Sequence, residues 1–161
     1  MFKLPDPDQV MGLPVGGHLF FHVEEGGETF SRKYTPTSVV NERGKIEFVI
    51  KAYNPCDEFP KGGKVSVYLS NMKIGDKIKM EGPKGLLFYY GNGNFELRKK
   101  PLKKTKVGLI AGGTGITPCY QLIQAAALSK DTIDIVLLYS NKTKDDILVK
   151  EDLDKYAEIS E

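Results

Sequence analysis

The segment Gly112–Pro118, which reads GGTGITP, is the part of this 161-residue chain best suited to hold a ligand. Glycines let the backbone turn sharply and approach a ligand without clashes from Cβ atoms. A helix that starts directly after them offers unpaired N–H groups and the positive end of its dipole to an anion. Pro118 suits the first turn of such a helix, where its missing N–H costs nothing. The segment predicts an anion-binding turn, and a tight turn without a ligand is the alternative.

This pattern differs from the two common phosphate-binding motifs. A G-x-G-x-x-G fingerprint that begins at Gly113 needs glycine at position 118, where the chain has Pro118, and no G-K-[S/T] follows as in a P-loop. Cys56 and Cys119 are far apart in the chain and have no C-x-x-C spacing. We therefore expect neither a metal site nor a disulfide, which is typical of a reducing compartment.

The elements around the glycine segment predict a parallel sheet. Residues 107–111 form a short, wholly apolar run, as expected for a strand buried on both faces. Residues 117–128 have apolar side chains at helical spacing, and residues 133–139 form a second apolar run. This order is that of a βαβ unit. We expect the nucleotide-binding type of domain that it begins to occupy residues 102–161.

The first hundred residues are predicted to be rich in β-strands. Glycine- and asparagine-containing turns separate short apolar runs, which favours an antiparallel sandwich or barrel. Residues 63–71 contain no turn former after their glycine and predict a short helix. The apolar runs are residues 19–23, 30–35, 46–53, 78–80 and 86–90. We expect residues 1–101 to form one domain.

Charge and hydropathy exclude several classes of partner. The 23 basic and 21 acidic side chains nearly balance, which argues against nucleic acid as a partner. The lysines between residues 99 and 106 are interpreted as a solvated linker. No apolar stretch approaches the roughly 20 residues that cross a bilayer, and the N-terminus is not a secretory signal. We expect no membrane contact from this chain itself.

A resemblance to a known family rests on several motifs. Residues 32–38, RKYTPTS, match the R-x-Y-T-P-x-S signature of the ferredoxin-reductase-like flavoproteins. Further segments resemble the NADH-cytochrome b5 reductase branch, in the family's order: Leu4–Pro7, Gly12–His18, Val49–Tyr53, Phe59–Leu69, Gly82–Leu86 and Ile110–Pro118. The resemblance covers nearly the whole chain. The family's additional N-terminal strand and its cysteine-glycine-proline motif are not in the sequence, so the resemblance is to a reductase truncated at both ends.

The resemblance implies a fold class and a set of flavin contacts. The fold would be mainly β plus α/β, with an antiparallel Greek-key flavin-binding β-barrel followed by the first βαβ portion of a parallel-sheet nucleotide-binding domain. Arg32 would pair with the FAD pyrophosphate, since a guanidinium suits phosphate oxygens. Tyr34 would pack on the isoalloxazine ring, and Thr35 would lie near flavin N5. Lys51 would attract NADH. Two further residues would line the flavin, namely Val49 and Tyr53.

The same resemblance implies contacts at the two helices. The short helix that begins with Gly63, Lys64, Val65 and Ser66 would present its N-terminus to the FAD phosphates. Thr117, beside Pro118, would contact FAD from the second domain. The glycine segment would face NADH through three residues, namely Gly113, Thr114 and Gly115. Thr35 and Lys51 would be the residues that matter most for catalysis.

The function implied by the resemblance is electron transfer. Hydride would pass from NADH to FAD, and single electrons would pass on to a haem protein such as cytochrome b5. The alternative is a non-catalytic or FAD-only accessory subunit, with another chain of a larger assembly as its partner. The family's usual place is intracellular, on the cytosolic face of the endoplasmic reticulum or of the mitochondrial membrane, and the family's membrane anchor is not in this sequence.

Overall fold

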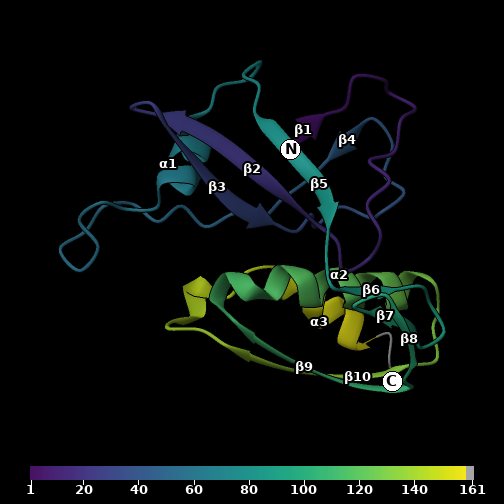
Figure 1. Ribbon diagram of the computed structural model, residues 1–161. Helices are drawn as coiled ribbons and strands as arrows, with labels where there is room; N and C mark the ends of the chain where they lie inside the picture. The colour runs from purple at the N-terminus through teal and green to yellow at the C-terminus, as the bar shows by residue number, and fades with distance from the viewer. Residues whose placement is uncertain (159–161) are drawn as a thin grey trace.

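The computed structural model describes residues 1–158 and arranges them in two halves, one above the other in Figure 1. The first half contains β1 (Phe2–Lys3), β2 (His18–Glu25), β3 (Glu28–Tyr34), β4 (Lys45–Ile46), α1 (Lys64–Asn71) and β5 (Lys79–Lys84). The second half contains β6 (Leu87–Tyr89), β7 (Asn94–Leu97), β8 (Lys100–Lys103), β9 (Lys106–Gly112), η1 (Gly113–Gly115), α2 (Ile116–Leu128), β10 (Asp134–Ser140), η2 (Lys144–Asp146) and α3 (Lys150–Glu158).

The first half is built on an antiparallel sheet in the order β3-β2-β5. Along β2, Leu19, Phe21 and Val23 are buried while the residues between them are not, as the two-residue period of a strand requires. Val65 of α1 and Ile46 of β4 join them in one core cluster. The short strands β1 and β4 pair separately. This core fixes the end of β3 and the start of α1 relative to each other.

The predicted sequence of antiparallel strands followed by a parallel unit is confirmed, but the strands of residues 1–158 do not close into a barrel. The apolar run 46–53 forms a strand only at Lys45–Ile46. Beyond it, the backbone has scattered partners: Thr37 N–H donates to the Glu47 carbonyl, and Gly63 N–H donates to the Tyr53 carbonyl. Part of this run lines a cavity and does not pair with a neighbouring strand. The regular hydrogen bonding between strands therefore stops after Ile46.

The lysine-rich segment is part of a hairpin and not a linker. Strand β8 pairs with β7, and β7 pairs with β6, in an antiparallel sheet. Arg98 and Lys99 both have positive φ, +51° and +65°, which is the backbone geometry of a tight two-residue hairpin turn. The sequence lacks the Asn-Gly or Asp-Gly pair that usually predicts such a turn. Phe95 of this hairpin packs with Leu122 of α2 in the core of the second half.

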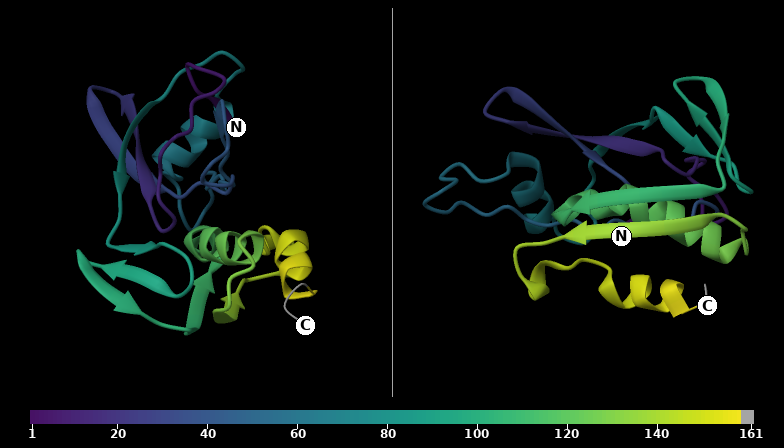
Figure 2. Two further views of the ribbon diagram at one scale, coloured as in Figure 1. Left: turned by 90° about the vertical axis from the view of Figure 1, so that its right-hand side faces the viewer. Right: turned by 90° about the horizontal axis from the view of Figure 1, so that it is seen from below.

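The βαβ unit is confirmed: β9 and β10 are parallel and α2 connects them. The expectation that β9 would be buried on both faces is wrong for the described residues. Helices α2 and α3 lie on the same side of the sheet, above β9 and β10 in Figure 1 and seen from two other sides in Figure 2. On the other side Ile110, Val136 and Leu138 are 82%, 72% and 65% exposed. None of the helices in residues 1–158 is long and apolar enough to cross a membrane.

Candidate functional site

A cavity of about 470 Å³ lies where the two halves meet. Its volume falls within the range of roughly 300–1,000 Å³ that small-molecule sites occupy. From the first half, the cavity is lined by predicted site residues Arg32, Tyr34, Thr35, Val49, Lys51, Tyr53, Gly63, Val65 and Ser66. From the second half, it is lined by Thr114, Gly115, Thr117 and Pro118. The fold therefore brings most of the predicted residues around one space.

The end of strand β3 places a cation and an aromatic ring at this cavity. Arg32 donates one hydrogen bond to the Ser31 carbonyl oxygen, at 2.8 Å, which leaves other guanidinium N–H groups for an anion. The ring of Tyr34 packs against Phe21 with centroids 4.9 Å apart. Burial raises the pKa of Tyr34, and the nearby charge of Arg32 opposes this shift. Tyr34 is thus a neutral, half-buried ring next to a positive charge, followed directly by Thr35.

The N-terminus of α1 opens toward the same cavity. A Cβ atom on Gly63 would lie 2.5 Å from Ser66 Oγ, so a side chain at this position would displace the Ser66 hydroxyl. Ser66 Oγ donates to the Gly63 carbonyl at 3.1 Å and accepts from Tyr53 N–H at 3.2 Å. Ser66 therefore fixes the run before the helix. Its side chain does not cap the helix, and no side chain among residues 1–158 forms a cap hydrogen bond there.

Lys64 and Gly113 lie apart from the other predicted site residues. The side chain of Lys64 leaves the cavity, pairs with Glu25 and lies over the Phe30 ring, 5.4 Å from its centroid. Gly113 does not line the cavity, and its carbonyl oxygen accepts a hydrogen bond from Tyr139 Oη at 3.0 Å. In both cases an internal contact directs the polar group away from the cavity.

The glycine segment forms a short 3₁₀ turn, η1, that runs directly into α2. Gly113 has φ +49°, which favours glycine. Gly115 has an ordinary helical φ of −65°, and a Cβ atom there would meet no protein atom within 4 Å. Packing does not require glycine at 115, and the absence of a side chain there leaves the start of α2 open to the cavity. As predicted, Pro118 lies in the first turn of the helix.

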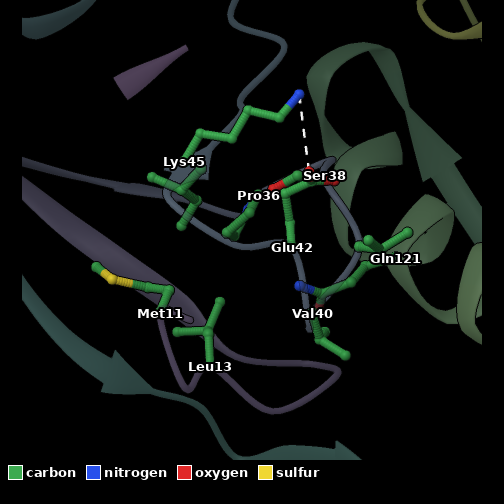
Figure 3. A pocket seen from close by; sticks show the side chains of 10 residues that line it. Met11, Leu13, Pro36, Ser38, Val40, Glu42, Lys45 and Gln121 are labelled. Atoms are coloured by element: carbon green, nitrogen blue, oxygen red, sulfur yellow. Dashed lines mark ion pairs between the residues drawn. The ribbon is translucent and has the colours of Figure 1, made fainter. Parts of the chain in front are cut away.

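Two glutamines of α2 join the halves. Gln121, only 1% exposed, accepts a hydrogen bond from Gly16 N–H at 2.6 Å, and Gln124 Nε2 donates to the Thr37 carbonyl at 3.2 Å. Beside Gln121 is a second, very small cavity of about 10 Å³, shown in Figure 3. This volume corresponds to about one water molecule. The second cavity is therefore a gap in the contact between the halves and is too small for an organic ligand.

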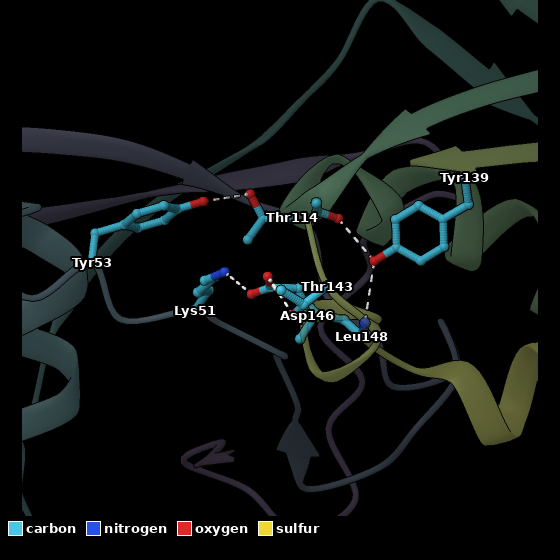
Figure 4. A network of polar contacts seen from close by, with 8 residues as sticks. Lys51, Tyr53, Thr114, Tyr139, Thr143, Asp146 and Leu148 are labelled. Atoms are coloured by element: carbon cyan, nitrogen blue, oxygen red, sulfur yellow. Dashed lines mark hydrogen bonds and ion pairs between the residues drawn. The ribbon is translucent and has the colours of Figure 1, made fainter. Parts of the chain in front are cut away.

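A polar network crosses from one half to the other beside the large cavity, as Figure 4 shows. Lys51 forms an ion pair with Asp146 of η2, and Tyr53 Oη lies 3.3 Å from Thr114 Oγ1. The hydrogen bond with Asp146 raises the pKa of Lys51, and the hydrogen bond from Lys51 is the largest cause that lowers the pKa of Asp146. Both side chains are therefore charged at neutral pH.

The cavity also contains residues to which the sequence assigned no role: Gly16, His18, Lys33 and Ile50. Each of these residues lies within one of the family motifs, but the sequence alone did not indicate that it would face the cavity. Burial, followed by the charge of Lys33, lowers the pKa of His18, which keeps the imidazole neutral at pH 7. Within residues 1–158 there is no group of three or more His, Cys, Asp or Glu side chains that could hold a metal ion.

The fold and this cavity define a class of protein, the oxidoreductases that bind a flavin and a nicotinamide nucleotide. The family model of the oxidoreductase FAD-binding domain matches residues 1–89, and that of the oxidoreductase NAD-binding domain matches residues 109–161. The first match covers more than half of the chain. The chain therefore belongs to the FAD-binding oxidoreductase family, whose cofactors are FAD and NAD.

Individual relatives confirm the resemblance to the cytochrome b5 reductase branch. The chain is 44% identical to NADH-cytochrome b5 reductase 2 of Gallus gallus, over 97% of this chain and 54% of that protein. It is 43% identical to nitrate reductase [NADH] 1 of Oryza sativa subsp. japonica, over 97% of this chain but 18% of that protein. The chain thus spans about half of the chicken protein and less than a fifth of the rice protein.

Solved structures agree with this assignment. The crystal structure of the cytochrome b5 reductase domain of Ulva prolifera nitrate reductase superposes with a TM-score of 0.92 at 36% identity, over 98% of this chain and 61% of that chain. The flavohem-like FAD/NAD-binding domain of nitric oxide dioxygenase from Vibrio cholerae superposes with a TM-score of 0.74 at 22% identity, over 98% of this chain and 62% of that chain. The second likeness shows the fold alone.

Proposed function

We propose that this protein binds FAD in the large cavity and takes part in electron transfer from NADH to a haem protein such as cytochrome b5. The observation that carries the proposal is the cavity itself, where Arg32, the N-terminus of α1 and the start of α2 converge. A guanidinium group and helix N-termini are the features that bind phosphate groups in proteins. A dinucleotide with a pyrophosphate centre fits this set of donors.

The chain's own residues would bind and orient the cofactor. Arg32 and the free N–H groups at the start of α1 would hold the pyrophosphate, while the half-buried ring of Tyr34 offers an apolar surface for the isoalloxazine. Thr35 adds a hydroxyl beside that ring. When bound, FAD supplies the ability to accept hydride and to release electrons one at a time. Hydride transfer needs no general acid or base from the protein.

The nicotinamide nucleotide would bind on the side of the second half. Thr114 and Gly115 line the cavity there, and Lys51 provides the positive charge that attracts its phosphates. We propose Thr35 and Lys51 as the residues that matter most for the reaction, one at the flavin and one at the nucleotide. We propose an intracellular setting, which agrees with the free thiols of Cys56 and Cys119.

An accessory role in a larger assembly is the second candidate. The exposed apolar side chains Ile110, Val136 and Leu138 on one face of the β9–β10 sheet favour it, since such a face is usually covered by other protein. In that case the protein would bind FAD without sustained NADH turnover.

The experiment that separates the candidates is spectroscopic. The purified protein is examined by visible absorption with and without added FAD, and reduction of cytochrome b5 by NADH is then followed. A flavin spectrum together with NADH-dependent reduction of cytochrome b5 supports the proposed function. A flavin spectrum without turnover supports an FAD-only accessory role. A folded protein that takes up no flavin contradicts the proposed function and favours a non-catalytic accessory role.

A further inference from the structure

The lysine assigned to nucleotide attraction already has an anionic partner. Lys51 lies in the run between β4 and α1, and its Nζ donates a hydrogen bond to Asp146 Oδ1 of η2, 95 residues further along the chain. Figure 4 shows the two side chains pointing toward each other across the junction of the halves. Their side chains are 39% and 25% exposed, so water and ions reach the pair.

Asp146 is held in position by the fold. Thr143 Oγ1 donates to its second carboxylate oxygen at 3.0 Å. The segment that follows is fixed to the glycine turn through Tyr139, whose Oη donates to the Gly113 carbonyl at 3.0 Å and accepts from Leu148 N–H at 3.2 Å. Thr143 therefore orients the carboxylate of Asp146, while Tyr139 links the segment just after Asp146 to the glycine turn.

The pair borders the place where a nucleotide would enter. Lys51 and Thr114 both line the large cavity, whereas Asp146 does not. An anionic group that approaches Lys51 from the cavity therefore meets a lysine whose charge is already compensated from the other side. A partly exposed ion pair is weak, so an incoming anion can replace Asp146 as the partner of Lys51. Loss of such a pair changes an affinity by up to about fivefold.

We infer that Asp146 is an internal competitor for Lys51: it pairs with the lysine when no nucleotide is bound, and the anionic part of the nicotinamide nucleotide must replace it. This inference rests on the proposed function and extends it to the control of nucleotide affinity. Asp146 weakens binding of the nucleotide and, by the same exchange, favours its release. With Asp146 present, the affinity for the nucleotide is lower than it would be if Lys51 had no anionic partner.

The test compares Asp146→Asn with Asp145→Asn, because Asp145 is the adjacent, exposed carboxylate of the same short helix. The dissociation constant of NADH is measured at low salt from the dependence of the anaerobic flavin reduction rate on NADH concentration. We expect Asp146→Asn to bind NADH about two- to fivefold more tightly, and Asp145→Asn to match the original protein. The Asp146→Ser variant serves if the asparagine variant does not fold.

A second pair of variants tests whether the effect acts through Lys51. In a Lys51→Met background, the Asp146→Asn change is expected to leave the NADH dissociation constant unaltered, because there is no lysine to release. The same tightening with and without the lysine would overturn the inference, as would unchanged or weaker binding in Asp146→Asn alone. If the original protein holds flavin that NADH does not reduce, it is the proposed function that fails, and the two failures are thus distinguishable.

Discussion

Arg32 is the residue on which the flavin assignment depends most. It is exposed at the cavity, and one hydrogen bond to the Ser31 carbonyl fixes its guanidinium without using all of its donors. We predict that Arg32→Ala weakens FAD binding by about 1.5–3 kcal/mol, the usual loss for hydrogen bonds to a charged group. Titration of the protein with FAD, followed by flavin fluorescence, measures this change. Arg43→Ala, at an exposed site with a 3.9 Å ion pair to Asp8, should bind FAD normally.

The two cysteines are predicted to differ in reactivity. Burial raises the pKa of Cys119, which is half-buried in α2, whereas Cys56 is exposed in a loop. Because the thiolate is the reactive form, iodoacetamide at pH 8 should modify Cys56 faster, by on the order of tenfold. Peptide mass spectrometry over time measures both rates. Equal rates would show that solvent reaches Cys119 freely, and a Cys56→Ser variant should retain only the slow reaction.

At the scale of elements, Asp131 joins the β6–β7 hairpin to the turn between α2 and β10. Its carboxylate accepts hydrogen bonds from Tyr89 Oη and Asn92 N–H. Burial tends to raise the pKa of Asp131, but these bonds and others from the backbone lower it overall. Burial, followed by the hydrogen bond with Asp131, raises the pKa of Tyr89 to about 12. The ionised carboxylate is thus the form that stabilises this junction.

The sign of the pH dependence follows from that shift. A carboxyl whose pKa is lower in the folded than in the unfolded state stabilises the fold above its ordinary pKa of 3.8, and this contribution is lost as the pH falls through the lowered value. We predict that Asp131→Asn lowers the free energy of unfolding by about 1 kcal/mol at pH 7, a modest loss because solvent reaches the site. The difference should shrink below about pH 4.

Denaturant unfolding at several pH values measures both effects. The control is Asp134→Asn, since the carboxylate of Asp134 is exposed and forms a 3.8 Å ion pair with Lys106, and the change should alter the stability by less than about 0.5 kcal/mol. A loss of stability in Asp131→Asn that persists unchanged at pH 3 would contradict the electrostatic explanation.

Local sequence pattern predicted some elements and missed others for physical reasons. The helix expected over 117–128 occurs as Ile116–Leu128, and the short helix expected within 63–71 occurs as Lys64–Asn71, because apolar spacing and glycines determine both locally. The run 46–53 is apolar enough for a strand, yet half of its residues line the cavity. Burial of β9 on both faces was expected from its composition, but composition does not reveal which faces other elements cover.

At the scale of the whole molecule, the site exists only where the halves meet. Gln121 and Gln124 of α2 bond to backbone groups of Gly16 and Thr37 in the first half. Most residues that line the cavity lie within the family motifs and were named from the sequence. The motifs could not reveal Asp146, because its contact with Lys51 joins residues 95 positions apart and depends on how the halves pack.

The most direct test of the central claim is an anaerobic titration of the FAD-loaded protein with NADH, followed by flavin absorption in the visible range. If the cavity is a site for both FAD and NADH, the flavin absorption bleaches, and it does so in proportion to the NADH added. A flavin spectrum that stays unchanged over the whole titration would contradict the claim that this protein passes electrons from NADH to FAD.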